Sequence, residues 1–267
     1  MPVVTLEISD RIATVTMNRP DARNALSSEV LTLLPKLMLE ANASDDVDVI
    51  ILTGADPAFS AGLDLKELGS QSGNLLGGSG TGGDSGAGGG ANSYGARGPF
   101  PTLTKPLIGA INGVAITGGF ELALNCDFLV ASERARFGDT HTRVGVMPGW
   151  GLTVLLPQAI GVRRAREMSF TGNFMMADEA LACGLVNHVV AHDDLLPFCR
   201  KIADDIVGNN QAGVRQIRST YAEVASQTVA EGWETEARIS HEWRKQSFSA
   251  DHVEEQRASI MSRGRSQ

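Results

Sequence analysis

The chain has 267 residues, of which 42% are hydrophobic and 20% charged, and its formal net charge is −8. These values are typical of a soluble globular protein with one main domain and a smaller appendage, and the negative charge argues against a broad nucleic-acid surface. No apolar run approaches the roughly 18 residues that span a membrane, and the first residues lack the basic region and apolar core of a signal peptide. We therefore expect a cytoplasmic protein.

The chain begins with two short apolar segments that predict a β-hairpin. Residues 3–8 and 12–17 are strand-like and are separated by a polar turn. A helix is expected after Ser27, because apolar residues recur there at helical spacing, namely Val30, Leu34, Leu37, Met38 and Ala41. Pro35 falls inside this pattern, so we expect a kink in the helix.

Two continuous apolar runs, at residues 47–53 and 107–111, are typical of strands that are covered on both faces. Helical segments are expected after Gly149 and at residues 178–182, and a strand is expected at residues 189–190. From about residue 195 the chain changes to long, charged amphipathic stretches. Strands that alternate with helices indicate the α/β class.

The segment from Gly69 to Gly98 has an unusual composition, with 13 glycines among its 30 residues. It cannot build a core of its own and loses much entropy on ordering, so a flexible loop is expected. The loop follows Leu65-Lys66-Glu67 directly, which would place it beside a ligand pocket. A lid and a solvated insertion without function are both open interpretations.

No motif in the sequence indicates a metal or a bound cofactor. The three cysteines, Cys126, Cys183 and Cys199, are odd in number and far apart, which favours reduced thiols over disulfides or a CxxC metal site. His188 and His192 have the spacing of a helical metal pair, but a strand is expected there and no third ligand follows. Neither a phosphate loop, a dinucleotide fingerprint nor a GxSxG elbow occurs.

Two segments combine an apolar strand with a turn of small residues. Ser60-Ala61-Gly62 follows the run at residues 47–53, and Gly118-Gly119 follows the run at residues 107–111 and opens a helix. Small residues let a ligand approach the backbone, and the first amides of a helix lack intrahelical acceptors, so both turns are expected to bind an oxyanion. Glu121 follows Gly118 by three residues, which places a carboxylate about one helical turn from that donor.

These segments, in this order and spacing, resemble the enoyl-CoA hydratase/isomerase (crotonase) family. The resemblance extends to residues 18–26, 137–138, 144–149 and 180–186, and it covers most of residues 3–200. It implies a spiral of ββα repeats over residues 1–194, which periodicity alone does not predict. It also implies a C-terminal helical trimerisation region over residues 195–267, in a homotrimer or in a hexamer built as a dimer of trimers.

The resemblance further implies an activity and a site. The expected enzyme is an enoyl-CoA hydratase, a lyase of fatty acid metabolism that adds water to a 2-enoyl-CoA thioester, with coenzyme A as part of the substrate and no separate cofactor. Matching the motifs places the oxyanion donors at Ala61 and Gly118 and the first catalytic carboxylate at Glu121. The residues expected to bind the substrate are Arg23, Ala25, Gly62, Leu63, Asp64, Leu65, Lys66, Gly119, Thr140 and Trp150, and Arg19 is a further expected cation near the CoA phosphates.

The chain departs from the family where the second glutamate of a hydratase is expected. That position, three residues beyond Phe137-Gly138, holds His141. His141 could orient the attacking water or return a proton to C2, since its ordinary pKa lets both forms occur near neutral pH. Asp139 is the reserve candidate, and His141→Glu is expected to retain or raise hydration. Isomerisation, hydrolysis, decarboxylation and mere acyl-CoA binding stay open as alternatives.

Overall fold

Three successive strand–strand–helix repeats form the part of the chain that carries the predicted site. The computed structural model describes residues 1–70 and 98–247, together with residues 254, 257 and 261. Most of the predicted flexible loop at residues 69–98 lies outside these residues, so that expectation stays a prediction. The repeats are β3 (Val49–Gly54), β4 (Ala58–Ser60) and α2 (Leu65–Gly69); β5 (Leu107–Ile111), β6 (Val114–Ile116) and α3 (Gly118–Leu124); and β7 (Phe128–Ser132), β8 (Arg136–Gly138) and α4 (His141–Val144).

Each repeat contributes one strand to each of two sheets. In the described part of the chain, the larger sheet has the order β1-β2-β3-β5-β7-β10 and the smaller one the order β4-β6-β8-β9. The first strands of the repeats pair in parallel, and so do the second strands. The chain therefore advances by one strand in both sheets with each repeat, which confirms the predicted spiral. The remaining strands are β1 (Val4–Ser9), β2 (Ile12–Met17), β9 (Phe174–Met176) and β10 (His188–Val190).

The N-terminal hairpin forms as predicted. β1 pairs antiparallel with β2, in a register that sets Val4 opposite Met17. The two residues of its turn, Asp10 and Arg11, both have positive φ, as tight hairpin turns of matching twist require.

The first helix begins where the sequence predicts. α1 (Ser28–Ala43) is capped by Ser27, whose hydroxyl accepts a hydrogen bond from Val30 N over 3.3 Å. Pro35 lies inside the helix, and its effect on the helix axis stays a prediction.

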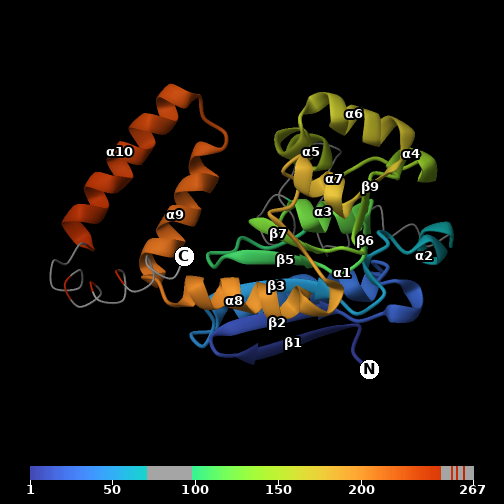
Figure 1. Cartoon of the computed structure of the whole chain (residues 1–267), viewed down its shortest axis with the longest axis horizontal. Helices are drawn as coiled ribbons and strands as arrows, with labels where there is room; N and C mark the ends of the chain where they lie inside the picture. Colours follow the sequence, from blue (N-terminus) through green and yellow to red (C-terminus); the bar gives the residue numbers. More distant parts are fainter. Residues whose placement is uncertain (71–97, 248–253, 255–256, 258–260, 262–267) are drawn as a thin grey trace. The chain divides into compact units, whose positions relative to one another are not determined.

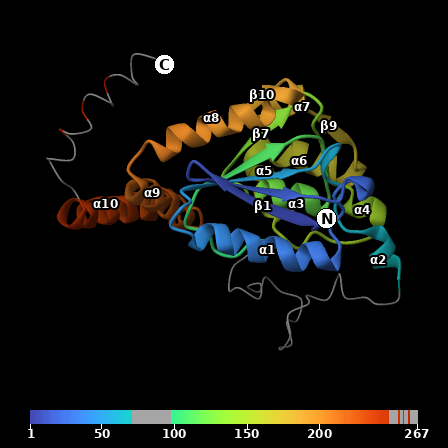
Figure 2. The same cartoon turned by 90° about the horizontal axis from the view of Figure 1, so that it is seen from below.

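Helices cover both faces of the larger sheet. In Figure 2, α1 and α8 (Leu195–Val207) lie on opposite sides of it. Successive side chains of a strand point to opposite faces. Ile50 and Leu52 of β3 therefore join the core that includes the apolar side of α1, whereas Val49 and Ile51 pack with α8. This double burial explains why the sequence is continuously apolar there.

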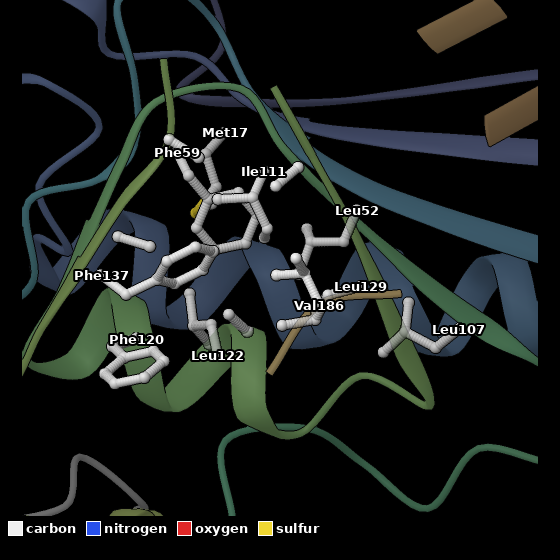
Figure 3. Close-up of a cluster of buried hydrophobic side chains, with 14 of the residues drawn as sticks. Met17, Leu52, Phe59, Leu107, Ile111, Phe120, Leu122, Leu129, Phe137 and Val186 are labelled. Carbon is white, nitrogen blue, oxygen red and sulfur yellow. The ribbon is translucent and has the colours of Figure 1, made fainter. Parts of the chain in front are cut away.

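A cluster of large apolar side chains fixes α3 beside the smaller sheet. Figure 3 shows Phe59 of β4 and Phe137 of β8 near Phe120 and Leu122 of α3. The three phenylalanines are fully buried, and the ring centroids of Phe120 and Phe137 are 5.6 Å apart. The cluster matters for function because α3 also carries Gly118 and Glu121.

The segments after the third repeat agree with the predictions. α5 (Leu152–Ile160) follows Gly149, and α7 (Ala177–Ala182) covers the second expected helix. The expected strand at residues 189–190 is β10. Figure 1 shows α6 (Val162–Thr171) near α5 and α7, and short 3₁₀ helices lie at Pro20–Ala22 and His192–Asp194. Among the helices described, none is both long and apolar enough to cross a membrane.

The chain divides into two compact units, Met1–Arg215 and Gln216–Gln267. Within the first unit, α8 packs on the larger sheet through Leu195, Cys199 and Ala203, and the predicted division between residues 194 and 195 stays a prediction. α9 (Gln211–Val224) spans the boundary, and the second unit contains α10 (Val229–Gln246).

Leu52→Ala should lower the free energy of unfolding by about 2–5 kcal/mol, because it removes buried methyl groups and leaves a cavity in a closely packed core. Leu39→Ala is the matched control, since Leu39 lies on α1 with 41% of its surface exposed, and its effect should stay within about 0.5 kcal/mol. Chemical denaturation of the two variants measures both values. Equal losses would contradict the packing of β3 described above.

Candidate active site

The carboxyl ends of three parallel strands meet at the candidate site. β4 lies beside β6, and β6 beside β8. After these strands the chain continues into the turn at residues 61–64, the start of α3, and the segment Asp139-Thr140-His141. The spiral thus brings together three predicted motifs that are far apart in the sequence.

The glycine pair at the start of α3 permits a close approach of two backbone segments. A Cβ atom on Gly119 would lie 2.4 Å from the carbonyl oxygen of Ser60, so only glycine fits there. A Cβ atom on Gly118 would lie 3.2 Å from both Leu26 Cδ1 and Trp150 Cζ3. Within the described residues the Gly118 N–H has no acceptor, as expected for the first amide of a helix. This amide is open to a ligand.

The turn after β4 corrects the predicted position of the other amide donor. Ala61 N donates to the carbonyl oxygen of Arg23 over 2.9 Å, so its hydrogen is already used and cannot bind an oxyanion. The Ser60 hydroxyl holds the turn in this orientation, because it donates to the Asn24 carbonyl over 2.8 Å and accepts from Gly62 N over 3.2 Å.

The next amide in the turn without an acceptor among the described residues belongs to Leu63. Gly62 has φ 79°, which redirects the backbone, and Leu63 then forms an isolated parallel bridge with Leu26. Leu26 bonds to Gly62 O and Asp64 N, so the N–H of Leu63 itself points away from its bridge partner. No described residue accepts it, and it lies 3.9 Å from the Cβ position of Gly118. Leu63, expected only to bind substrate, is therefore the better second donor.

Glu121 is a buried carboxylate of the site, with 3% of its surface exposed. Its Oε1 accepts hydrogen bonds from Trp150 N at 2.7 Å and Leu152 N at 3.4 Å. Asn125 Nδ2 holds the same loop by donating to Glu121 O and Trp150 O. Oε2 is left facing His141, with 3.4 Å to its Nε2. Trp150 thus positions the carboxylate through its backbone, in addition to packing at Gly118.

His141 lies between two carboxylates. Its Nδ1 is 2.6 Å from Asp139 Oδ1, and its Nε2 faces Glu121. Burial favours the neutral ring, but the hydrogen bonds with Asp139 and Glu121 outweigh this effect and raise the pKa of His141 to about 9. Burial also favours protonation of Asp139, but hydrogen bonds from His141 and Ser169 hold the pKa of Asp139 below its usual range. These contacts therefore favour the charged imidazolium over the neutral ring.

Arg19 and Asp64 brace the turn after β4. Arg19 Nη2 lies 2.9 Å from Asp64 Oδ2, and Arg19 Nη1 donates to the carbonyl of Ala25 over 2.6 Å. Asp64 Oδ1 also accepts from Lys66 N over 3.0 Å, which caps α2. Burial would raise the pKa of Asp64, but the hydrogen bonds from Arg19 and Lys66 hold it below its usual value. Arg19, expected near the CoA phosphates, is engaged in this ion pair.

The other predicted binding residues surround the same turns. Arg23, Leu65 and Lys66 are exposed at the surface, whereas Ala25 is buried. Thr140 directly precedes His141 and shares a hydrogen bond with another threonine of the site.

Sequence reasoning missed two features of the site. It offers Asp139 only as a reserve catalyst and does not predict its contact with the His141 ring, which lies two residues further along the chain. The amides that hold Glu121, from Trp150 and Leu152, were missed because backbone donors leave no side-chain pattern.

A Ser-His-Asp arrangement occurs elsewhere but is structural. Ser132 Oγ lies 3.0 Å from His192 Nδ1, and His192 Nε2 lies 2.9 Å from Asp56 Oδ2. Ser132 has no exposed surface, and its hydroxyl already accepts from Arg134 N. These contacts tie β7 to the segment after β3.

The three cysteines are free thiols, as predicted. Within the described ranges, no group of three or more histidine, cysteine, aspartate or glutamate side chains is arranged to hold a metal ion.

Comparison with known proteins identifies the family. The family model for enoyl-CoA hydratase/isomerase matches residues 7–260. The chain belongs to this family. It is 40% identical over 218 residues to the probable peroxisomal enoyl-CoA hydratase 1 of Arabidopsis thaliana, covering 79% of this chain and 75% of that protein. It is 38% identical to the short-chain-enoyl-CoA hydratase of Clostridium acetobutylicum, covering 79% and 78%.

Solved structures confirm the predicted crotonase fold. The enoyl-CoA hydratase structure from Mycobacterium tuberculosis superposes with a TM-score of 0.74 at 47% identity, covering 90% of this chain and 98% of that one. The Geobacillus kaustophilus structure reaches a TM-score of 0.83 at 30% identity, covering 97% and 95%.

Asp139→Asn should lower the pKa of His141 from about 9, because it removes a negative charge from Nδ1. NMR titration of the imidazole measures the change. Asp178→Asn, on α7, is the matched control and should leave the His141 titration as it is. An unchanged titration in Asp139→Asn would show that this carboxylate does not hold the ring charged.

The raised pKa of His141 also predicts how the free energy of unfolding depends on pH. The pKa of His141 is higher in the folded state than its ordinary 6.5, so its contribution to stability is fully present below about pH 6.5 and is lost as pH rises through about 9. Between these values the free energy of unfolding should fall more in the wild type than in His141→Gln. Parallel pH profiles of the two proteins would contradict this.

Proposed function

We propose that this protein is an enoyl-CoA hydratase, which adds water across the double bond of a 2-enoyl-CoA thioester. The names of its relatives from Arabidopsis and Clostridium support the activity. The observation that carries the proposal is the arrangement of the buried Glu121 carboxylate, which contacts His141, in a site with two open backbone amides.

In the proposed reaction, the thioester carbonyl oxygen lies between the N–H groups of Leu63 and Gly118. Attack of water at C3 moves negative charge onto this oxygen, and fixed amide donors stabilise the charge where it develops. Removing one such donor typically costs about 100- to 1000-fold in turnover. Both donors belong to the backbone, so the contribution depends on how the two turns are held.

Glu121 and His141 exchange the protons in this proposal. Glu121 Oε2 takes a proton from the water as its oxygen bonds to C3, and His141 Nε2 gives its proton to C2. When the product leaves, Glu121 carries a proton and His141 lacks one. The 3.4 Å contact between Oε2 and Nε2 lets that proton return. The net change is the addition of H and OH to the substrate.

Coenzyme A enters as part of the substrate, and the proposal requires no separate cofactor. We place its phosphates near the exposed cations Arg23 and Lys66, and its acyl group near Gly62, Gly119 and Trp150. The homotrimer or dimer of trimers, the role in fatty acid metabolism and the cytoplasmic location stay predictions from the sequence.

Isomerisation of an enoyl-CoA is the second candidate. The direct contact between Glu121 and His141 favours it, since a proton relay of this kind can move a proton between two carbons of the substrate without added water. The structure of a monofunctional enoyl CoA isomerase from M. smegmatis also superposes, with a TM-score of 0.69 at 31% identity over 87% of this chain and 98% of that one.

One experiment separates these functions. The purified protein is incubated with a panel of acyl-CoA and enoyl-CoA esters, and the products are identified by mass spectrometry and NMR. Hydration adds one water, isomerisation leaves the mass unchanged but moves the double bond, hydrolysis releases free coenzyme A, and decarboxylation releases carbon dioxide. Return of every ester unchanged would reject the enzyme and favour a binding protein.

Glu121→Gln should lower hydration of crotonyl-CoA by at least about 100-fold and leave binding nearly unchanged, because glutamine keeps the shape and removes the basicity. Steady-state kinetics and calorimetric binding measure the two effects. Glu29→Gln, an exposed change on α1, is the control and should keep wild-type turnover. Wild-type turnover in Glu121→Gln would show that Glu121 is not the general base.

His141→Ala should reduce hydration by roughly 10- to 1000-fold, the range of one acid–base partner. The wild-type rate should also fall as pH rises through about 9, because the imidazolium loses its proton there. A rate that is flat across this range, or unaffected by alanine, would exclude His141 as the acid.

The contacts of His141 favour a different expectation for His141→Glu from the one based on the family pattern. The substituted carboxylate would lie between Asp139 and Glu121, and three carboxylates cannot all stay charged at such distances. We expect His141→Glu to lose hydration, and the added change Asp139→Asn to restore part of it. Full activity of His141→Glu alone would contradict this.

A further inference from the structure

We propose that Thr117 is a positioning residue that holds the two amide donors and the His141 segment in fixed relation through its hydroxyl contact with Thr140. This inference rests on the proposed function, because it concerns the same site.

The backbone of Thr117 has a conformation that its residue type disfavours. Its φ is 51° and its ψ is −124°, and a β-branched residue at positive φ is a clear outlier. Such conformations persist only where the surrounding structure imposes them, and they concentrate at functional sites. Thr117 immediately precedes Gly118, so this conformation sets the direction of the Gly118 N–H.

The hydroxyl of Thr117 does not perform the usual task of its position. Thr117 is the N-cap of α3, where a threonine side chain normally accepts from an amide of the first turn, yet no such bond forms. Its Oγ1 instead shares a hydrogen bond of 2.9 Å with Thr140 Oγ1. The backbone of Thr117 bonds to the same segment, because Thr117 N donates to the carbonyl of Gly138 over 3.1 Å. Two bonds thus join the start of α3 to the segment that leads to His141.

The same side chain also contacts the turn that carries the other amide. A Cβ atom on Gly62 would lie 2.9 Å from both Cβ and Oγ1 of Thr117, so the threonine packs directly against the Cα of Gly62. Gly62 immediately precedes Leu63. Thr117 is buried and therefore touches all three segments of the site: the Leu63 turn, the start of α3 and the segment before His141.

These contacts suggest that Thr117 positions the catalytic groups and does not bind the substrate itself. Thr117 has no reacting atom, but a displacement of about 1 Å in a catalytic group can cost about 100-fold in rate. Loss of the hydroxyl contact should therefore lower kcat more than it raises KM.

The test compares Thr117→Val, Thr140→Val and the double variant with Thr117→Ser, using crotonyl-CoA. Each valine variant should lower kcat by about 10- to 100-fold with KM changed by less than about threefold. The double variant should be no worse than the poorer single one, because both changes remove the same bond. Thr117→Ser keeps the hydroxyl and should recover most of the loss. Thr32→Val is the control, since its hydroxyl bonds within α1 to Ser28 O and Thr32 lies outside the site.

Hydrogen exchange in the ligand-free proteins gives a second readout that does not depend on catalysis. Thr117→Val should speed exchange at residues 60–65 and 137–142 while α1 keeps its protection. Unchanged exchange there, multiplicative losses in the double variant, or a wild-type kcat in Thr117→Val would overturn the proposal. If the wild type converts no thioester, the proposed function fails, and the exchange experiment still decides the role of Thr117.

Discussion

The candidate site depends on the parallel pairing of β4, β6 and β8. Parallel neighbours end at the same edge of a sheet, so three turns from successive repeats meet there. The first turn presents the Leu63 amide, the second the Gly118 amide and Glu121, and the third His141. The aromatic cluster of Phe59, Phe120 and Phe137 contributes one ring from each repeat and holds the three segments together. The same order of parallel strands therefore forms both the aromatic core and the site.

The charge of the site depends on how the His141 ring is paired with its neighbouring carboxylates. A charged imidazole is costly to bury unless it is paired and hydrogen-bonded, and His141 is paired on both nitrogens. Asp139 fixes Nδ1 as a donor, which leaves the Nε2 hydrogen directed at Glu121. A histidine held in this way can donate a proton at neutral pH, as a protonated carboxyl group would. The substitution at the family's second acid position is thus compatible with the proposed hydration.

Most polar side chains around the site hold backbone in place. Asn24 accepts from Arg19 N and donates to the carbonyls of Ala55 and Ala58, so the segment before α1 is tied to the turn before β4. Arg19 and Asp64 brace the next turn. This distribution fits a mechanism in which backbone amides stabilise the developing charge, because such donors act only if they are fixed before the reaction.

The family, the α/β class, the hairpin and the apolar strands could be predicted from the sequence, as could Glu121 and His141 as candidate site residues, because hydrophobic periodicity and local motifs depend on neighbouring residues. The sequence did not determine which amide of the turn after β4 is open. Ala61 and Leu63 both lie in the motif, and only the contacts with Arg23 and Leu26 show that the first is used and the second is open. The amides that hold Glu121, the surroundings of His141 and the packing of α8 on the sheet could not be predicted either, since each depends on groups that the fold brings together from distant parts of the chain.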